Sequence, residues 1–191
     1  MAVSSRIILG IDPGTASTGF GVIAQRGSRL EVVEYGVVRT EAGEELSDRL
    51  REIFAAVGEI LRHHRAAEAA VESLFFNVNA RTAFAVGQAR GVALLACAQS
   101  GCKVHEYTPQ EVKQAVVGYG KADKAQVQEM VRVLLRLTEP PKPDHASDAL
   151  AVAICHAHGR GLRARIERTP GRAAHGATRS GGRPDRRGEG D

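Results

Sequence analysis

Residues 6–40 read RIILGIDPGTASTGFGVIAQRGSRLEVVEYGVVRT and decide the fold class. The first part, RIILGID, is a short apolar run that ends in a charge, and a Gly-containing turn separates it from GFGVIAQ. After the link RGS, the remaining residues alternate between apolar and polar, as in a strand with one solvated face. Consecutive strands with such short connections predict an antiparallel meander at the start of the chain.

The pattern changes to a helical period between Leu46 and Leu61, and basic residues follow where the helix dipole favours cations. Residues 67–76 form a further candidate strand. The Ala-rich residues 79–100 then predict a helix that Gly101 closes. Strands first, and then strands alternating with helices, indicate an α/β sheet that contains at least one antiparallel strand.

The C-terminal half carries two helix starts marked by capping boxes. In each, an N-cap residue is followed three positions later by Glu or Gln: Thr108 with Glu111, and Asp123 with Gln126. The first helix follows a strand at 103–108, and the second is predicted to run through Leu137. A last helix is expected after Asp144, which is a good N-cap residue.

Length and composition predict one domain with an ordinary core. The chain has 191 residues, of which 43% are hydrophobic and 25% charged. No apolar run is long enough for a membrane span, and the N-terminus lacks a signal-peptide pattern. Cysteines 97, 102 and 155 form no CxxC pair. A reducing, cytoplasmic location is therefore expected.

The net charge of +4 has its origin in the C-terminal tail. Nine Arg and four acidic residues follow His158, whereas residues 1–158 carry a net charge of −1. We expect 1–158 to form the folded domain and 159–191 to be a disordered, Gly/Arg-rich basic tail. Such a tail either contacts DNA phosphates or keeps the protein soluble, and charge alone does not identify the partner.

Chemistry-bearing residues stand at the ends of predicted elements. Asp12 and Glu72 each follow an apolar strand, where open α/β sheets keep their sites, and His145 and Asp148 share one face of a helix start. Individually, these residues fit structural roles: Asp12 as the cap of a turn, Glu72 as a strand end, and the helix start as a place where acidic groups complement the helix dipole. Together they favour a divalent cation such as Mg²⁺, which takes oxygen ligands, and hence metal-assisted hydrolysis.

Four segments carry a family resemblance in order between Arg6 and His158: GIDPGTASTGFG, VESLFFNVNARTAFAVGQARG, EYTPQEVKQAVVGYGKADKAQVQEMV and HASDALAVAICHAH. Together they resemble the RuvC family of Holliday-junction resolvases. The resemblance implies a ribonuclease H-like fold, a five-stranded mixed sheet flanked by helices, assembled as a homodimer. It also implies Mg²⁺-dependent nicking of two opposed strands at a four-way DNA junction, with two ions per site, and cooperation with a branch-migration motor complex.

The same resemblance assigns site residues. Asp12 and Glu72 match the first two catalytic acids of the family, and Asp148 matches the last. His145 stands where many members carry a fourth acid and some carry a histidine, so a role as ligand, proton carrier or electrostatic tuner stays open. Because Mn²⁺ accepts nitrogen ligands more readily, we expect it to support activity at least as well as Mg²⁺.

The resemblance also implies DNA contacts. Phe75 matches a base-contacting aromatic residue, and Lys113 and Lys124 match positions that contact DNA near the scissile phosphate. Further phosphate contacts are predicted for three residues that lie near these positions in the sequence: Lys121, Arg81 and Asn77. The structural alternatives are a core position for the aromatic ring and solvated faces for the basic residues.

Two other classes of protein remain open. The pattern DPGTASTG also fits sugar-kinase and actin-like ATPases, although these need a second domain to enclose a nucleotide. A junction-binding module without activity would need a defective metal site, for which His145 is the sole candidate. The remaining histidines considered are expected on solvated helix ends without a role: His63, His64, His156 and His158.

Overall fold

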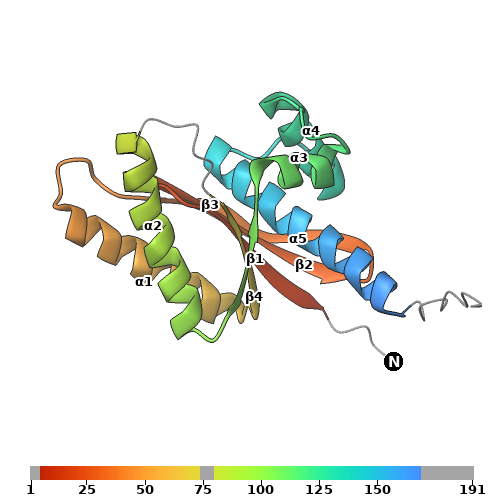
Figure 1. The fold of residues 1–191 in the computed structure, drawn as a ribbon, viewed down its shortest axis with the longest axis horizontal. Helices are drawn as coiled ribbons and strands as arrows, with labels where there is room; N and C mark the ends of the chain where they lie inside the picture. Colours follow the sequence, from red (N-terminus) through yellow and green to blue (C-terminus); the bar gives the residue numbers. More distant parts are fainter. Residues whose placement is uncertain (1–4, 74–79, 169–191) are drawn as a thin grey trace, which may run out of the picture.

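The computed structural model describes residues 5–73 and 80–168 and contains a five-stranded mixed sheet (Figure 1). Its strands are β1 (Arg6–Asp12), β2 (Ser17–Arg26), β3 (Arg29–Arg39), β4 (Glu68–Glu72) and β5 (Lys103–Tyr107), in the spatial order β3-β2-β1-β4-β5. Strands β1, β2 and β3 pair antiparallel in sequence, whereas β4 is parallel to both β1 and β5. This architecture confirms the predicted meander and the predicted five-stranded mixed sheet.

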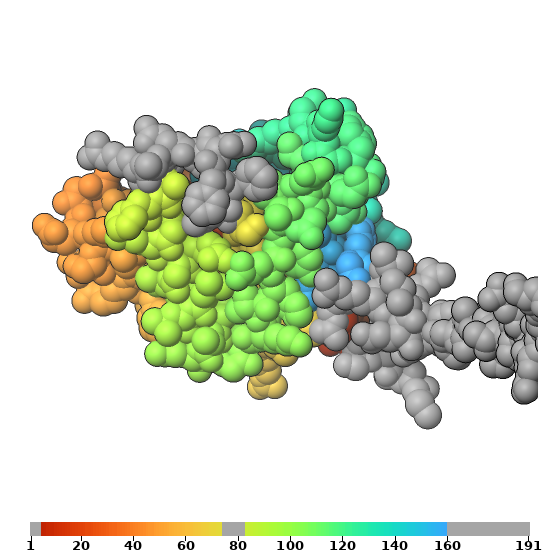
Figure 2. Space-filling model, viewed as in Figure 1, coloured from red at the N-terminus to blue at the C-terminus, as the bar shows by residue number. Residues whose placement is uncertain are grey.

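Helices cover both faces of the sheet (Figure 1). They are α1 (Leu46–His64), α2 (Ala80–Gln99), α3 (Pro109–Val117), α4 (Lys124–Leu134) and α5 (Asp144–Arg168). In the space-filling view, residues 46–64 (orange) lie beside residues 80–99 (yellow-green) on the surface (Figure 2). Helices α1 and α2 pack together on one face, and α5 crosses the other face with α3 and α4 beside it. No helix in the described part of the chain combines the length and apolar character needed to cross a membrane.

The central strand β1 builds a separate core on each face. Successive side chains of a strand point to opposite faces, so Ile8 joins the cluster under α5 while Leu9 and Ile11 join the cluster under α1 and α2. All three side chains are fully buried. A strand buried on both faces reads as a continuous apolar run, which is why RIILGI shows no alternation.

Helix α5 lies directly on the backbone of β1 and β2 because glycines face it. A Cβ atom on Gly10 would lie 2.0 Å from the carbonyl oxygen of Ala149, and one on Gly19 would lie 2.0 Å from that of His145. Real Cβ atoms do not approach backbone oxygens so closely. The absence of side chains at these positions therefore sets how near the first turns of α5 come to the end of β1.

Replacing Gly19 by Ala is expected to destabilise the fold by about 2–3 kcal/mol, because the new methyl group must push the start of α5 off the sheet. The same change moves His145 away from Asp12. Urea unfolding measures the loss. Gly43→Ala is the matched control, since nothing lies within 4 Å of a Cβ there; equal stability of the two variants would contradict this account of the contact.

Several element boundaries differ from the predicted ones. Strand β4 ends at Glu72, while residues 74–76 of the predicted strand 67–76 lie outside the described residues. Helix α4 ends at Leu134 rather than at 137. Helix α5 continues through Arg168, beyond the predicted domain boundary at 158. Residues 169–191 lie outside the described residues, and the disordered tail stays a prediction.

The prediction that His156 sits on a solvated helix end is wrong. Its side chain is fully buried between α5 and the sheet, where Nδ1 accepts from the Tyr107 hydroxyl and Nε2 donates to Glu68, both at 2.7 Å. Glu68 also accepts from Arg6 at 2.8 Å. Burial lowers the pKa of His156 despite the bond to Glu68. The neutral ring thus closes a buried polar chain that ties α5 to β4 and β5.

Candidate active site

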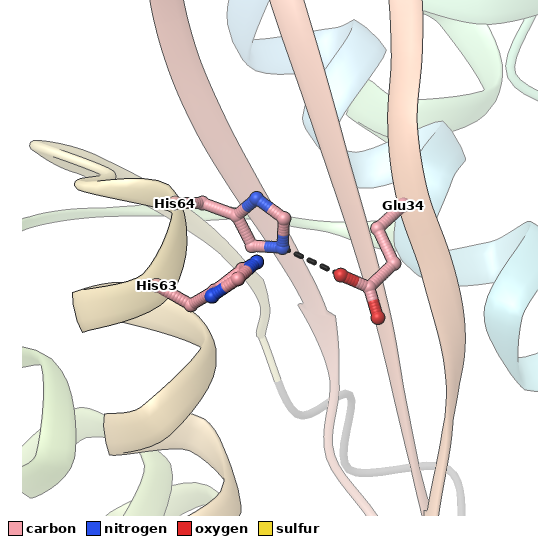
Figure 3. A group of neighbouring side chains, drawn as sticks. All are labelled: Glu34, His63 and His64. Atoms are coloured by element: carbon pink, nitrogen blue, oxygen red, sulfur yellow. Dashed lines mark hydrogen bonds and ion pairs between the residues drawn. The ribbon is translucent and has the colours of Figure 1, made fainter.

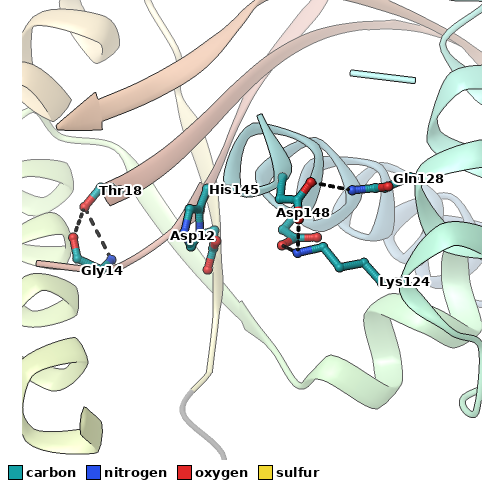
Figure 4. A network of polar contacts seen from close by, with 8 residues as sticks. Asp12, Gly14, Thr18, Lys124, Gln128, His145 and Asp148 are labelled. Carbon is teal, nitrogen blue, oxygen red and sulfur yellow. Dashed lines mark hydrogen bonds and ion pairs between the residues drawn. The ribbon is translucent and has the colours of Figure 1, made fainter. Parts of the chain in front are cut away.

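Two carboxylates end neighbouring parallel strands. Asp12 is the last residue of β1 and Glu72 the last of β4, so both stand at the same edge of the sheet. The turn after β1 is held by the buried Thr18, whose hydroxyl donates to the Gly14 carbonyl at 2.7 Å and accepts from the Gly14 N–H at 3.4 Å (Figure 4). These two bonds fix the path of the backbone directly after Asp12.

The first turns of α5 deliver two further groups to this edge. His145 Nδ1 lies 2.7 Å from Asp12 Oδ2, and Asp148 follows one turn later on the same helix face (Figure 4). One ligand-type atom from each of Asp12, His145 and Asp148 lies within 4.8 Å of the others. The exposed fraction of the side chain is 16% for Asp12, 29% for Asp148 and 51% for His145. The cluster is therefore partly buried and open on the histidine side.

Lys124, the first residue of α4, adds a cation to the cluster. Its ammonium lies 3.3 Å from Asp148 Oδ2 and 3.0 Å from Asp144 Oδ2. Burial opposes its charge, but hydrogen bonds to both carboxylates outweigh that effect and raise the pKa of Lys124. The cation therefore stays charged while it compensates part of the negative charge at the start of α5.

The predicted capping role of Asp144 is wrong. Helix α5 already includes Asp144, and the carbonyl of Pro143 accepts the first helical N–H groups. The carboxylate instead accepts from Lys124 and from Gln128, both at 3.0 Å, and these bonds lower the pKa of Asp144. Asp144 thus joins α5 to α4 and orients the lysine that reaches Asp148.

Glu72 shares a cavity of about 260 Å³ with Asp148, Lys113 and Lys124. Burial, followed by the negative charges of Asp12 and Asp148, raises the pKa of Glu72 to about 7, while Lys113 opposes the shift. The cavity therefore places two carboxylates and two ammonium groups around a volume that admits a small anionic group such as a phosphate.

The carboxylates repel one another in the absence of a cation. Burial raises the pKa of Asp12, the bond to His145 lowers it, and the charge of Asp148 raises it again. A divalent ion near Asp12, Glu72 and Asp148 would relieve this repulsion. The donor set, which combines carboxylate oxygens with one imidazole, fits such an ion.

The predicted site residues divide into three groups. Asp12 and His145 are hydrogen-bonded, and Asp148 lies within 4.8 Å of both. Glu72 shares a cavity with Asp148. Lys113 and Lys124 line that cavity, and Lys121 lines an adjoining cavity of about 360 Å³ together with Lys113. The positions predicted for the remaining contacts carry no described side chain: Phe75 and Asn77 fall in 74–79, and of Arg81 only the helical backbone is described.

Sequence reasoning missed three residues that shape this site. Gly10 and Gly19 admit α5, and Thr18 holds the turn after Asp12. A signal for the glycines existed in the small-residue run ASDALAVA at 146–153, since a helix face without bulk can approach a glycine-bearing strand closely. Nothing local marked Thr18 among the small polar residues of its turn.

Comparison with known proteins supplies the family. The family profile for the crossover junction endodeoxyribonuclease RuvC matches residues 8–156. The crossover junction endodeoxyribonuclease RuvC of Rubrobacter xylanophilus is 56% identical over 154 residues, which cover 81% of this chain and 86% of the relative. Its counterpart in Heliobacterium modesticaldum is 59% identical over 152 residues, which cover 80% and 94%.

Solved structures agree with this match. The structure of T. thermophilus RuvC in complex with Holliday junction substrate has a TM-score of 0.79 and 39% identity, and it covers 83% of this chain and 96% of that one. The yeast mitochondrial Holliday junction resolvase Ydc2 shares the fold, with a TM-score of 0.59 at 11% identity over 87% of this chain and 86% of that one. From the profile match and these identities, the chain belongs to the RuvC family of crossover junction endodeoxyribonucleases.

Proposed function

We propose that this chain resolves Holliday junctions by divalent-metal-dependent nicking of two opposed DNA strands, in recombination and repair. The observation that carries the proposal is the meeting of Asp12, His145 and Asp148 beside a cavity that holds Glu72 and two lysines. A 39% identical relative is described in complex with Holliday junction substrate, which supports a four-way junction as the DNA target.

The chain's own residues position the scissile phosphate and neutralise its charge. The ammonium groups of Lys113 and Lys124 would bind the oxygens of the scissile phosphate as point charges. His145 Nδ1 donates its proton to Asp12 when that carboxylate is ionised, because an ionised carboxylate can only accept. Bound divalent ions would activate the attacking water and stabilise the leaving oxygen of the phosphodiester.

Mg²⁺ is the proposed ion, with two ions per site, held by Asp12, Glu72, Asp148 and His145. Each carboxylate occupies one or two coordination positions of an ion. This suits Mg²⁺, because Mg²⁺ retains several water ligands and also takes oxygens of the substrate phosphate. The imidazole is the exception in this oxygen-rich set, and Mn²⁺ binds nitrogen ligands better than Mg²⁺ does.

Replacing His145 by Ala is expected to lower the cleavage rate about 10–100-fold in Mn²⁺, as loss of a metal-site partner commonly does. The rate in Mg²⁺ should fall less, so the ratio of the two rates changes. Initial rates on one junction at equal concentrations of the two ions measure the effect. If the unmodified enzyme works with Mg²⁺ alone and the His145→Ala variant is equally active, His145 has no role in the active site.

The proposed assembly is a homodimer, since two opposed strands need two active sites. Helix α2 supports a subunit contact: Phe84 is 70% exposed and Leu95 is 52% exposed. Eleven residues separate them, which is close to three helical turns, so the two side chains share one face. Cooperation with a branch-migration motor complex and a cytoplasmic location stay predictions.

Incubation of the full chain with a synthetic four-way junction and Mg²⁺ or Mn²⁺ tests the proposal. Paired nicks at symmetric positions, with ends that a ligase reseals, are the expected products. Tight junction binding without nicks in either ion would instead indicate a binding module. ATP hydrolysis in the absence of DNA would favour the actin-like alternative.

A further inference from the structure

An irregularity in the edge strand β3 turns one carboxylate toward α1. Val22 of β2 pairs with Glu34, and the next residue, Ile23, pairs with Val32, so Val33 is an extra residue in β3. Ile23 and Val32 belong to the α5 face of the sheet, whereas Val22 belongs to the α1 face. Without the bulge Glu34 and Val32 would share a face. The bulge therefore aims Glu34 at the C-terminal end of α1.

Two histidines at the end of α1 meet this carboxylate (Figure 3). His64 Nε2 lies 2.6 Å from Glu34 Oε2, and the His64 side chain is only 10% exposed. The ring of His63 stands edge-on to that of His64 with centroids 4.7 Å apart. One ligand-type atom from each of the three residues lies within 4.8 Å of the others.

The three side chains open into a cavity of about 370 Å³. Phe20 and Ile60 supply apolar walls, and Glu59 lines the same cavity. Glu59 precedes His63 by four residues and so lies on the same face of α1. The cavity thus combines a cluster of nitrogen and oxygen donors with room for an ion and its remaining water ligands.

The chemistry of these donors selects the class of ion. Two imidazoles and a carboxylate suit Zn²⁺ and its first-row neighbours, whereas Mg²⁺ prefers oxygen ligands alone. Zn–N bonds of about 2.0–2.1 Å would draw the donor atoms closer together, which rotation of the exposed His63 and half-exposed Glu34 allows. The carbonyl end of α1 also favours a cation here.

A second histidine–carboxylate cluster in the described residues, Glu68 with His105 and His156, is unsuited to an ion. The Arg6 guanidinium already lies 2.8 Å from Glu68 Oε2, and His156 is fully buried with both ring nitrogens engaged. An ion there would have to displace a cation and break a closed polar chain.

We propose that Glu34, His63 and His64 bind one transition-metal ion of the Zn²⁺ class, which ties the edge strand β3 to the end of α1. The site lies on the α1 face of the sheet, away from α5 and the carboxylates at the end of β1. It is independent of the proposed nuclease activity, and its failure would leave that activity untouched.

Zinc titration of the full chain tests the site. Excess Mg²⁺ is kept present to occupy the oxygen-rich active site, and a chromophoric chelator reports free Zn²⁺. His63→Ala and Glu34→Gln are each expected to weaken binding at least about tenfold, as loss of a ligand or its partner does. Zn²⁺ should also raise the Tm of the unmodified chain more than that of His63→Ala. Circular dichroism confirms that both variants fold.

His158→Ala is the matched control, since His158 is another exposed histidine, at 3.1 Å from the Ala115 carbonyl on the α5 face. It should bind Zn²⁺ like the unmodified chain. The proposal is overturned if the unmodified chain binds no Zn²⁺ under these conditions. It is equally overturned if His63→Ala binds Zn²⁺ as tightly as the unmodified chain while His145→Ala does not.

Discussion

Replacing Asp148 by Asn is expected to reduce the rate of four-way junction cleavage at least ~10³-fold, which corresponds to about 4 kcal/mol of transition-state stabilisation. The amide keeps the shape of the side chain but loses the charge that faces Asp12, His145 and Lys124. Junction binding should persist, because removal of a negative charge does not weaken attraction to phosphates. Single-turnover cleavage and gel-shift binding on the same junction measure the two effects separately.

Asp48→Asn provides the control for this variant. Asp48 is an exposed carboxylate in the first turn of α1, where it pairs with Arg51 on the other face of the sheet. Its removal should leave cleavage unchanged. If Asp148→Asn cleaved at the rate of Asp48→Asn, the carboxylate would have a structural role alone. Loss of folding in Asp148→Asn would lead to the same conclusion.

Glu72→Gln is expected to stabilise the metal-free protein by up to about 3 kcal/mol at pH 8, because a carboxyl group with a pKa of about 7 is forced to ionise there. The sign follows from proton binding. Since the folded state holds this proton more tightly than the unfolded state, stability falls as pH rises from about 4.5 to about 7. The advantage of the glutamine should therefore be full above pH 7 and vanish near pH 4.

Urea unfolding in a chelator, measured at both pH values, tests this expectation. Glu129→Gln is the control, since Glu129 is exposed on α4 and pairs with Arg132. Divalent ions supply a second check, because they stabilise the folded state that binds them. Addition of Mg²⁺ at pH 8 should favour the unmodified chain over Glu72→Gln. A pH-independent effect of the substitution would show that burial does not perturb this carboxyl group.

The chemistry of the site could be predicted from the sequence, whereas its geometry could not. Asp12 and Glu72 stand at strand ends and His145 and Asp148 at a helix start, and such positions follow from local patterns. How closely α5 approaches β1 and β2 depends on Gly10 and Gly19, whose effect appears only when the helix is placed on the sheet. Family resemblance identified the four residues as one site, and the structure shows which of them touch.

Contacts between distant elements explain the wrong predictions. Asp144 reads as a cap because its helix start is local, but Lys124 and Gln128 of α4 compete for its carboxylate. His156 is predicted to be solvated because it stands near the end of an apolar run. In the structure its buried ring is hydrogen-bonded to Tyr107 and Glu68. No pattern along the chain shows which residues of other elements will face a side chain.

We propose that this site cuts DNA according to the shape of a four-way junction. The most direct measurement compares the rate at which the unmodified chain nicks one strand sequence in a synthetic four-way junction and in a linear duplex, in Mn²⁺ or Mg²⁺. We predict fast, symmetric nicks on two opposed strands of the junction and nicking at least ~10²-fold slower in the duplex. Equal rates on the two substrates, or no nicks in the junction with either ion, would contradict the claim.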